Sequence, residues 1–149
     1  MALPSYLYTL IPNSLDEPFI ETSEPTRNYN CISWAYEDTT EWYWPDYKSY
    51  WPNGIPREVT IDAFRLLFEY IGYEVCDDHQ LENGFQKIAI YADINNVPTH
   101  AARQLPDGLW TSKLGPVHDV THTIHNMSHG AYGNVAIVMR RKISNKEYK

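Results

Sequence analysis

The stretch HAARQLPDGLWTSKL, residues 100–114, predicts a β-hairpin from which the rest of the fold can be worked out. Pro106 suits the first central position of a type I turn, Asp107 suits the second, and Gly108 suits the left-handed residue of the bulge that follows. Because such a turn reverses the chain, residues 100–105 and 109–114 are expected to pair as antiparallel strands.

The register of this hairpin predicts which side chains share a face. A three-residue connection sets Leu105 opposite Leu109, so alternate positions on either side of the turn lie together. One face then carries His100 and Ser112 as diagonal neighbours, with Ala102, Gln104, Trp110 and Leu114. The other face collects polar residues that are expected to be solvated, namely Arg103, Thr111 and Lys113. The His100 face is therefore expected to turn toward the core.

The remaining pattern predicts an α+β domain with an antiparallel sheet. Apolar residues recur at helical spacing over residues 61–71, with Asp62 in the first turn and Gly72 just past the end. Two further apolar runs, residues 87–92 and 134–141, are typical of strands. Helices near the start followed by a run of strands favour helices packed on one antiparallel sheet.

Composition limits the class of protein. With 149 residues, 43% of them apolar, the chain is expected to form a single domain over residues 1–149, with an irregular arm at 1–28. A net charge of -7 argues against a nucleic-acid partner. No apolar run reaches the roughly 20 residues of a membrane span, so no membrane association is expected.

Cysteine usage favours a reducing compartment. The chain has only Cys31 and Cys76, which are too few for a disulfide framework, and it opens on MALP without a charged and then apolar leader. We therefore expect a cytoplasmic location.

Cys31 lies where the Pro-rich arm gives way to an apolar, helix-compatible stretch. Backbone N–H groups in the first turn of a helix lower the pKa of a thiol and can donate to an oxyanion that forms beside it. The alternative is a small buried thiol that fills core space. Because His100 opens a strand that should face this helix, the two residues are expected to act as nucleophile and base.

The order of these features resembles the papain-like cysteine hydrolases, most closely their small NlpC-type branch, over roughly residues 29–141. The shared features are Asn-Cys-Ile-Ser-Trp-Ala at a helix start, a strand that opens with histidine, an Asp-Gly turn and a return strand. The resemblance implies that Cys31 is the nucleophile, that His100 is the general base and that Ser112 orients the imidazole, without a cofactor. The family has His, Asn or Asp at the third position, and a serine hydroxyl orients an imidazole more weakly.

Other residues are candidates for supporting roles. Asp119 follows the return strand and could replace Ser112 as the orienting group, or it could be the N-terminal acid of a helix that begins at residues 118–122. Asn30 or Asn28 could donate to the oxyanion beside the Cys31 amide.

An aromatic-rich segment, Trp34–Trp51, has two interpretations of equal weight. Its rings could line a substrate cleft or grip a protein partner, with Trp34 and Trp110 among the binding residues. They could equally fill the space between a short helix and the sheet.

A stripe of four histidines offers a metal site. The four residues are His118, His122, His125 and His129, which are four, three and four positions apart. If residues 118–129 form a helix, this spacing places the imidazoles on one side, where they could bind zinc. No glutamate lies between them and no ligand from a third element is evident, so no metal is assigned.

These features lead to one expected function and two alternatives. We expect a hydrolase of an amide, peptide or isopeptide bond, or a glutamine deamidase, that works through a thioester on Cys31. Transfer of the acyl group to an amine would use the same site. Its substrate would be a protein or peptide, and the resemblance fits a bacterial or phage effector. The alternatives are a non-catalytic binding module on the same scaffold and a zinc-binding domain.

Overall fold

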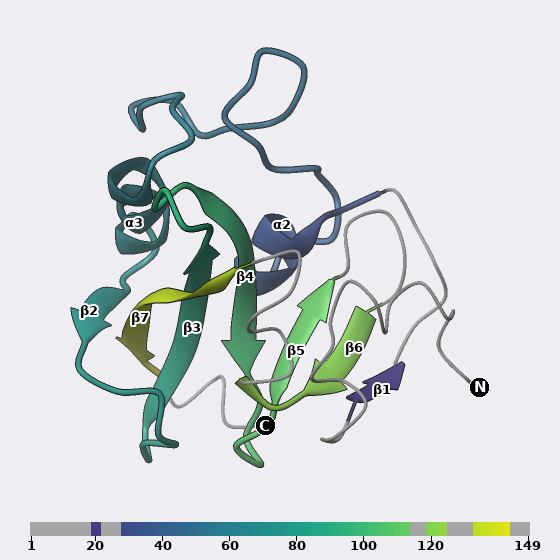
Figure 1. Ribbon diagram of the computed structural model, residues 1–149, viewed down its shortest axis with the longest axis vertical. Coiled ribbons are helices and arrows are strands. Elements are labelled where there is room, and N and C mark those ends of the chain that lie inside the picture. The colour runs from purple at the N-terminus through teal and green to yellow at the C-terminus, as the bar shows by residue number, and fades with distance from the viewer. Residues whose placement is uncertain (1–18, 22–27, 114–118, 125–132, 144–149) are drawn as a thin grey trace.

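The computed structural model describes residues 19–21, 28–113, 119–124 and 133–143 (Figure 1). They form a seven-stranded sheet in the order β1-β6-β5-β4-β3-β7-β2, in which neighbouring strands are antiparallel. The strands are β1 (Phe19–Glu21), β2 (Glu74–Cys76), β3 (Phe85–Ala92), β4 (Pro98–Gln104), β5 (Trp110–Lys113), β6 (Asp119–His122) and β7 (Asn134–Lys142). The expected α+β class with an antiparallel sheet is confirmed at this level.

The predicted hairpin forms β4 and β5 with the expected turn. Gly108 has a φ of 90°, its N–H donates to the carbonyl of Leu105 at 3.0 Å, and the Leu105 N–H donates to Leu109 at 2.7 Å. Gln104 pairs with Trp110, so the three-residue connection and its register are confirmed.

Two helices pack on one side of the sheet, α2 (Cys31–Ala35) and α3 (Ile61–Glu69). Helix α3 matches the predicted segment: the Thr60 side chain caps its N-terminus, and the chain turns at Gly72, whose φ is 99°. Its buried stripe is Ala63, Phe64, Leu67 and Phe68. Figure 1 shows the short helix α2 beside and partly behind β4, above the end of β5.

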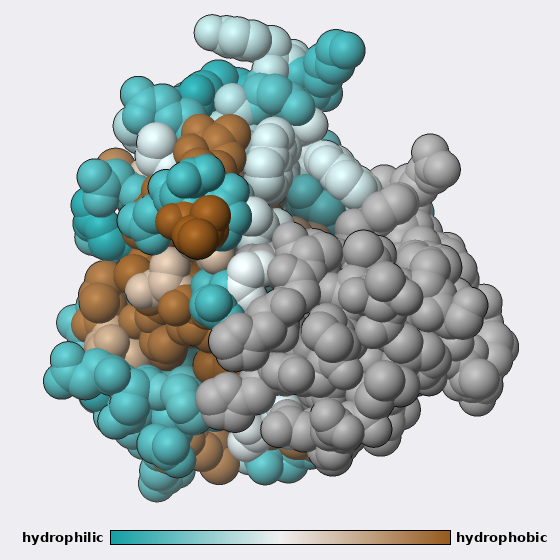
Figure 2. Space-filling model, in the orientation of Figure 1, coloured by the Kyte–Doolittle hydropathy of each residue, from teal (hydrophilic) through white to brown (hydrophobic). Residues whose placement is uncertain are grey.

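Side chains that alternate along the central strands build two separate cores. On the helix side, Ile88, Ile90 and Ala101 join the buried residues of α2 and α3. The opposite face packs a second cluster of Ala89, Tyr91, Ala102, Trp110, Val120, Ile124 and Val138. Both faces of the central strands are therefore buried. Figure 2 shows apolar residues over the β2, β7 and β3 side of this second face, bordered by polar residues.

The aromatic segment is mainly core. Tyr43 and Trp51 are 3% and 2% exposed, and the rings of Trp44 and Trp51 both contact Phe64 of α3, at 5.5 and 5.4 Å between centroids. Only Tyr47 and Tyr50 are exposed among the aromatic residues of Trp34–Trp51. The structure therefore favours the core-filling interpretation over an aromatic binding surface.

Three short strands escaped the sequence analysis. β1 lies inside the arm that was expected to be irregular, β2 ends at Cys76, and β6 occupies residues that were assigned to the start of a helix. That helix assignment was wrong because Val120 and Thr121 pair with Ser112 and Thr111 of β5, which satisfies their backbone groups in a ladder. Among the described residues, no helix is long and apolar enough to cross a membrane.

Gly133 offers a stringent test of the packing between β3 and the start of β7. Its φ is 78°, and a Cβ atom there would collide with the Ala92 carbonyl, 2.7 Å from its carbon. Gly54 has a similar φ of 89° but no atom within 4 Å of a built Cβ. Gly133→Ala should therefore lower the free energy of unfolding by about 3 kcal/mol or more, whereas Gly54→Ala should cost about 1 kcal/mol. Urea denaturation of both variants measures the difference, and equal losses would show that the close approach is relaxed.

Candidate active site

Cys31 is the first residue of α2 and is held there by Asn30. The Asn30 Oδ1 atom accepts the Ser33 N–H at 3.1 Å, and the Ser33 hydroxyl accepts the Asn30 N–H at 2.8 Å, which forms a capping box. The Asn30 Nδ2 group donates to the Tyr43 carbonyl at 2.6 Å. The Asn30 amide is therefore bonded as a structural cap, which contradicts its expected role as an oxyanion donor.

Helix α2 contacts the sheet where β4 and β5 stop pairing. The β4–β5 ladder consists of two pairs, Gln104 with Trp110 and Arg103 with Thr111, whereas the β5–β6 ladder continues to Lys113. The Cys31 sulfur accepts the backbone N–H of Ala101, in the part of β4 that pairs with β3 but not with β5. The thiol is thus one peptide unit from His100, at the fork between the two strands.

The His100 side chain lies on the second face of the sheet. Its ring packs edge-on against Tyr91 at 5.4 Å, and its Nε2 atom is 2.9 Å from the Ser112 hydroxyl, so the predicted pairing of His100 with Ser112 is confirmed. The expectation that this face turns toward α2 was wrong. The sheet face that meets α2 is the one that carries Thr111, which accepts the Trp34 indole N–H at 3.0 Å.

Ser112 continues the contact to a third buried side chain. Its hydroxyl is 2.6 Å from Nε2 of His122 in β6, and Nδ1 of His122 is 2.5 Å from the carbonyl of Thr123. His100, Ser112 and His122 are all 0% exposed. The sequence analysis placed His122 in a metal stripe and missed this role. The β-branched run around Val120 was the signal for a strand, which would have set His122 beside the hairpin.

Burial governs the ionisation of Cys31 and His100. It raises the pKa of the Cys31 thiol to about 11, although N–H groups of Ala101, Ile32 and Cys31 itself and the charge of Lys113 oppose it. Burial also lowers the pKa of His100 well below its usual value, and the nearby His122 lowers it further. The resting groups are a neutral thiol and a neutral imidazole at pH 7. The expected thiolate was wrong because burial outweighs the helix start.

A charged cluster lies on the helix side of β5. Lys113 is 0% exposed, its ammonium lies 5.2 Å from the centre of the Tyr29 ring, and its strand partner is Asp119. The Tyr29 hydroxyl donates to Asp119 Oδ2 at 2.6 Å. Asp119 therefore supports Tyr29 and lies on the face opposite Ser112, so the structure does not bring it to His100. Lys113 was expected to be solvated, and its buried position corrects that expectation.

The other predicted binding residues have mixed outcomes. Trp110 is 2% exposed within the second core cluster, which contradicts a role in substrate binding. Trp34 is half-buried, stacks on Tyr29 at 5.4 Å and carries the Arg103 guanidinium at 5.3 Å over its ring. Asn28 is exposed. Of the histidine stripe, only His122 lies within the described residues, where it belongs to a strand and not a helix.

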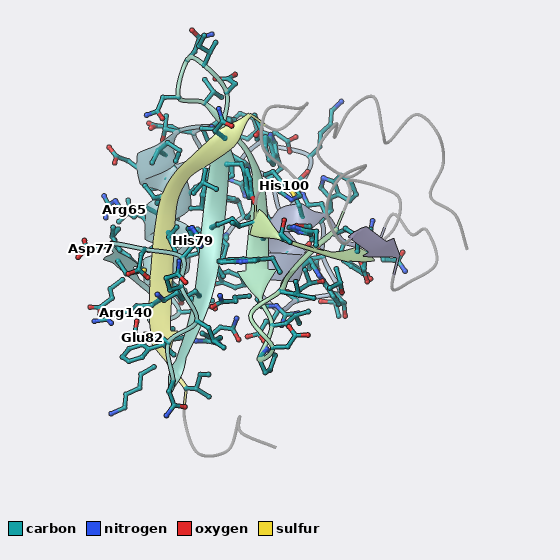
Figure 3. All side chains as sticks on the ribbon, turned by 60° about the horizontal axis from the view of Figure 1, so that its bottom comes forward. Arg65, Asp77, His79, Glu82, His100 and Arg140 are labelled. Carbon is teal, nitrogen blue, oxygen red and sulfur yellow. The ribbon has the colours of Figure 1, made fainter. Side chains whose placement is uncertain are left out.

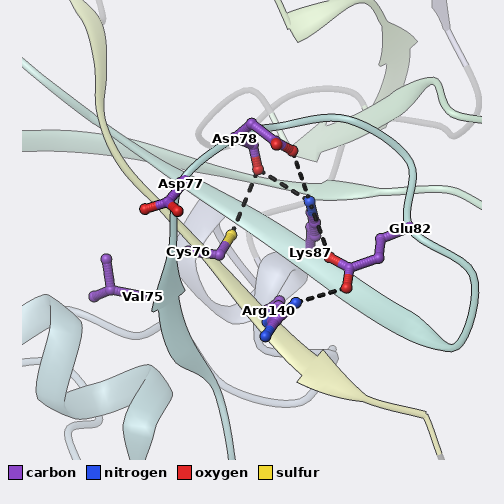
Figure 4. A pocket seen from close by; sticks show the side chains of 7 residues that line it. All are labelled: Val75, Cys76, Asp77, Asp78, Glu82, Lys87 and Arg140. Atoms are coloured by element: carbon purple, nitrogen blue, oxygen red, sulfur yellow. Dashed lines mark hydrogen bonds and ion pairs between the residues drawn. The ribbon is translucent and has the colours of Figure 1, made fainter.

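The second thiol has a different setting at the far edge of the sheet. Cys76 lines a hollow of about 210 Å³ with Asp78, Glu82, Lys87 and Arg140 (Figure 4). Lys87 is 2% exposed and contacts Asp78 at 3.1 Å and Glu82 at 3.4 Å. Figure 3 shows His100 well apart from the Glu82 and Arg140 side chains of this hollow. Both cysteines are free thiols.

Residues 20–140 match the profile of a protein family that is described as a domain of unknown function, DUF7689. The chain belongs to the DUF7689 family. The matched range of the DUF7689 domain runs from β1 to β7 and includes Cys31, His100, Ser112 and His122. Comparison with the curated proteins gave no match, and comparison with the solved structures gave none.

No group of three or more His, Cys, Asp or Glu side chains in the described part of the DUF7689 domain is arranged to hold a metal ion.

Acid should destabilise the DUF7689 domain through its two buried imidazoles. Burial lowers the pKa of His122 to about 4, so below about pH 6.5 the unfolded chain binds a proton that the folded chain excludes. Stability contributed by His122 is therefore present above pH 6.5 and falls by about 3 kcal/mol as the pH approaches 4. Urea denaturation between pH 7 and pH 4 measures this slope. His122→Gln should flatten it, and an unchanged slope in that variant would contradict the assignment.

The charges of the buried residues Lys113 and Lys87 should each raise the reactivity of a different thiol. The charge of Lys113 lowers the pKa of Cys31, and the charge of Lys87 lowers that of Cys76. Lys113→Met should therefore slow modification of Cys31 by iodoacetamide at pH 8, because loss of the positive charge lowers the thiolate fraction. Lys87→Met is the matched control and should slow only Cys76. Peptide mass spectrometry resolves the two sites, and equal effects on both thiols would show a general change in the fold.

Proposed function

We propose that the protein is a papain-like, cysteine-dependent hydrolase of an amide, peptide or isopeptide bond, or a glutamine deamidase. The observation that carries the proposal is the Cys31 thiol at a helix start, bonded to the N–H of Ala101 next to His100, while His100 is bonded through Nε2 to Ser112. Acyl transfer needs a nucleophile, a base and an orienting group, and the proposal assigns these roles to Cys31, His100 and Ser112. It requires that the thiol reaches Nδ1 of His100 around the start of β4, because the His100 ring lies on the second face of the sheet.

The proposed reaction begins with transfer of the thiol proton to His100. Because Nε2 of His100 is bonded to Ser112, the proton goes to Nδ1. The Cys31 sulfur attacks the carbonyl carbon, and the C–N bond then breaks as the imidazolium gives its proton to the leaving nitrogen. The leaving group is an amine, or ammonia in a deamidation. Water activated by the same imidazole attacks the thioester, which releases the acid and restores the thiol.

Main-chain groups are the proposed oxyanion donors. The N–H groups of Cys31 and Ile32 lie in the first turn of α2, where helix backbone amides lack intrahelical partners, and both contribute to the surroundings of the sulfur. They replace the Asn30 side chain, which is bonded to Ser33 and Tyr43.

The neutral resting pair sets the proposed pH behaviour. With the thiol pKa raised to about 11, the thiolate forms only as the proton moves to His100 during attack. Lys113 then faces the new negative charge from β5 and lowers its energy. Cys31 is only 7% exposed, so the bond to be cleaved has to reach a buried sulfur. The proposed substrate therefore presents this bond in a narrow, extended segment.

A non-catalytic protein-binding domain is the second candidate. The observation in its favour is the burial of both Cys31 and His100, at 7% and 0% exposed. The core position of most of the Trp34–Trp51 rings removes the aromatic surface that was expected to serve this role.

Acyl-enzyme formation separates the two candidates. A mixed library of peptide aminomethylcoumarins and glutamine peptides should yield a mass increase on Cys31 in the wild-type protein. Cys31→Ala and His100→Ala should each abolish turnover, because one removes the attacking atom and the other the proton acceptor. Ser112→Ala should lower turnover by about tenfold to a hundredfold, since nucleophile and base remain.

Cys76→Ala is the control and should leave turnover unchanged, because Cys76 lies in a hollow that neither Cys31 nor His100 lines. Turnover that survives in Cys31→Ala would refute the hydrolase. Absence of both turnover and acylation across the library, in a protein that binds peptides from it, would instead support the binding domain.

A further inference from the structure

The contacts of His122 fix the direction of a chain of hydrogen bonds that ends on His100. The carbonyl oxygen of Thr123 can only accept, so Nδ1 of His122, 2.5 Å away, must carry the hydrogen. His122 is neutral at pH 7, because burial lowers its pKa to about 4. Its other nitrogen, Nε2, therefore carries no hydrogen and acts as an acceptor.

The acceptor on His122 also determines the direction of the hydrogen bond between Ser112 and His100. The Ser112 hydroxyl has a single hydrogen, and the acceptor 2.6 Å away on His122 takes it. Toward His100, 2.9 Å away on the other side, the hydroxyl oxygen can then only accept. Nε2 of His100 must be the donor, and in a neutral ring that leaves Nδ1 without a hydrogen.

We propose that His122 is a positioning residue that acts through Ser112 to hold His100 in the Nε2–H tautomer, with Nδ1 as the basic nitrogen. The inference rests on the proposed function for its catalytic meaning, because Nδ1 is the atom that would take the Cys31 proton. The tautomer itself is a property of the buried contacts and exists whether or not the protein turns over a substrate.

This assignment accounts for the serine at the third position. A lone hydroxyl can donate or accept toward an imidazole, so it would allow both tautomers of His100. A hydroxyl with a fixed acceptor behind it can only accept from His100. The pair of Ser112 and His122 thereby supplies the directional acceptor that a single Asn, Asp or His gives in the family that the sequence resembles. All three side chains are 0% exposed, so bulk water does not compete for these bonds.

Among the described residues, the surroundings of these three side chains are mainly apolar. The ring of Tyr91 packs edge-on against His100, and the same face carries Ala102, Trp110 and Val120. The cluster of Lys113 and Asp119 belongs to the opposite face of β5 and β6, since those residues alternate with Ser112 and Val120 along the strands.

Nitrogen-15 NMR of histidine-labelled protein at pH 7 tests the inference directly, because the two ring nitrogens of a neutral imidazole report which one carries the hydrogen. His100→Gln identifies the His100 signals by their loss. The expected wild-type result is Nε2–H on His100 and Nδ1–H on His122. A His100 ring with its hydrogen on Nδ1 overturns the inference without any need for a substrate.

A pair of variants tests whether His122 is the cause. His122→Gln keeps one acceptor and one donor, so His100 should remain in the Nε2–H tautomer. His122→Phe removes the acceptor, which lets Ser112 donate to His100, and the Nδ1–H tautomer should appear. A His100 tautomer that is unchanged in His122→Phe overturns the positioning role. If that variant does not fold, His122→Leu removes the same acceptor with a smaller side chain while Ser112 stays in place, and it should also bring in the Nδ1–H tautomer.

Kinetics then separate this inference from the proposed function. If the hydrolase is correct, acylation of Cys31 should fall by about a hundredfold in His122→Phe but less than tenfold in His122→Gln, because a wrong tautomer withdraws the base. If wild-type protein shows Nε2–H on His100 and never forms an acyl-enzyme, the relay stands and the hydrolase fails. Acylation that is equal in both variants removes His122 from the mechanism.

Discussion

The side-chain amide of Asn30 holds together the part of the molecule on which everything else at the fork depends. A five-residue helix has too few internal hydrogen bonds to be stable alone, so its direction has to be set from outside. Asn30 does this by closing the capping box with Ser33 and by bonding the Tyr43 main chain, 13 residues further on. The loop that carries the aromatic core and the helix that carries Cys31 are thereby joined at one buried residue.

The sheet separates two electrostatic environments that meet only near the fork. On the helix side of β5 and β6, Lys113, Asp119 and Tyr29 form a charged group within side-chain packing. On the other side, His100, Ser112 and His122 are neutral and linked by hydrogen bonds among apolar neighbours. A proton acceptor is best kept neutral, whereas a developing anion is best met by a cation. Because side chains alternate along β5, the adjacent residues Ser112 and Lys113 lie on opposite faces. One faces the neutral histidines and the other places a cation on the helix side.

The sequence predicted features that depend on local chemistry and missed those that depend on distant partners. The Pro106-Asp107-Gly108 turn, its register and the stripe of α3 follow from neighbouring residues, and all three are confirmed. The His100 face of the hairpin is buried, as predicted, but the opposite face is buried as well and is the one that meets α2. That face was assigned to solvent because Arg103 and Lys113 carry charge. Their charges are instead met by Glu37 at 3.7 Å and by the Tyr29 and Asp119 pair, from segments remote in sequence. The pairing of Ser112 with His100 was predicted, whereas the contact of His122 with Ser112 needed the β5–β6 register in addition to the strand signal around Val120.

Strand order also governs when this fold can form. β7 is the last strand along the chain, yet it lies between β3 and β2, so β2 has no place in the sheet until the C-terminal strand has been made. The hairpin of β4 and β5, together with β6, needs only nearby segments, whereas closure against β7 joins residues more than forty positions apart, such as Ile90 and Ile137. In a chain emerging from the ribosome, Ser112 and His122 would therefore be available to His100 before β2 could join the sheet through β7. Until β7 has been made, the backbone N–H and C=O groups along one edge of β3 are unpaired and can bond to other chains. Pairing with the C-terminal strand therefore protects the sheet against misassembly.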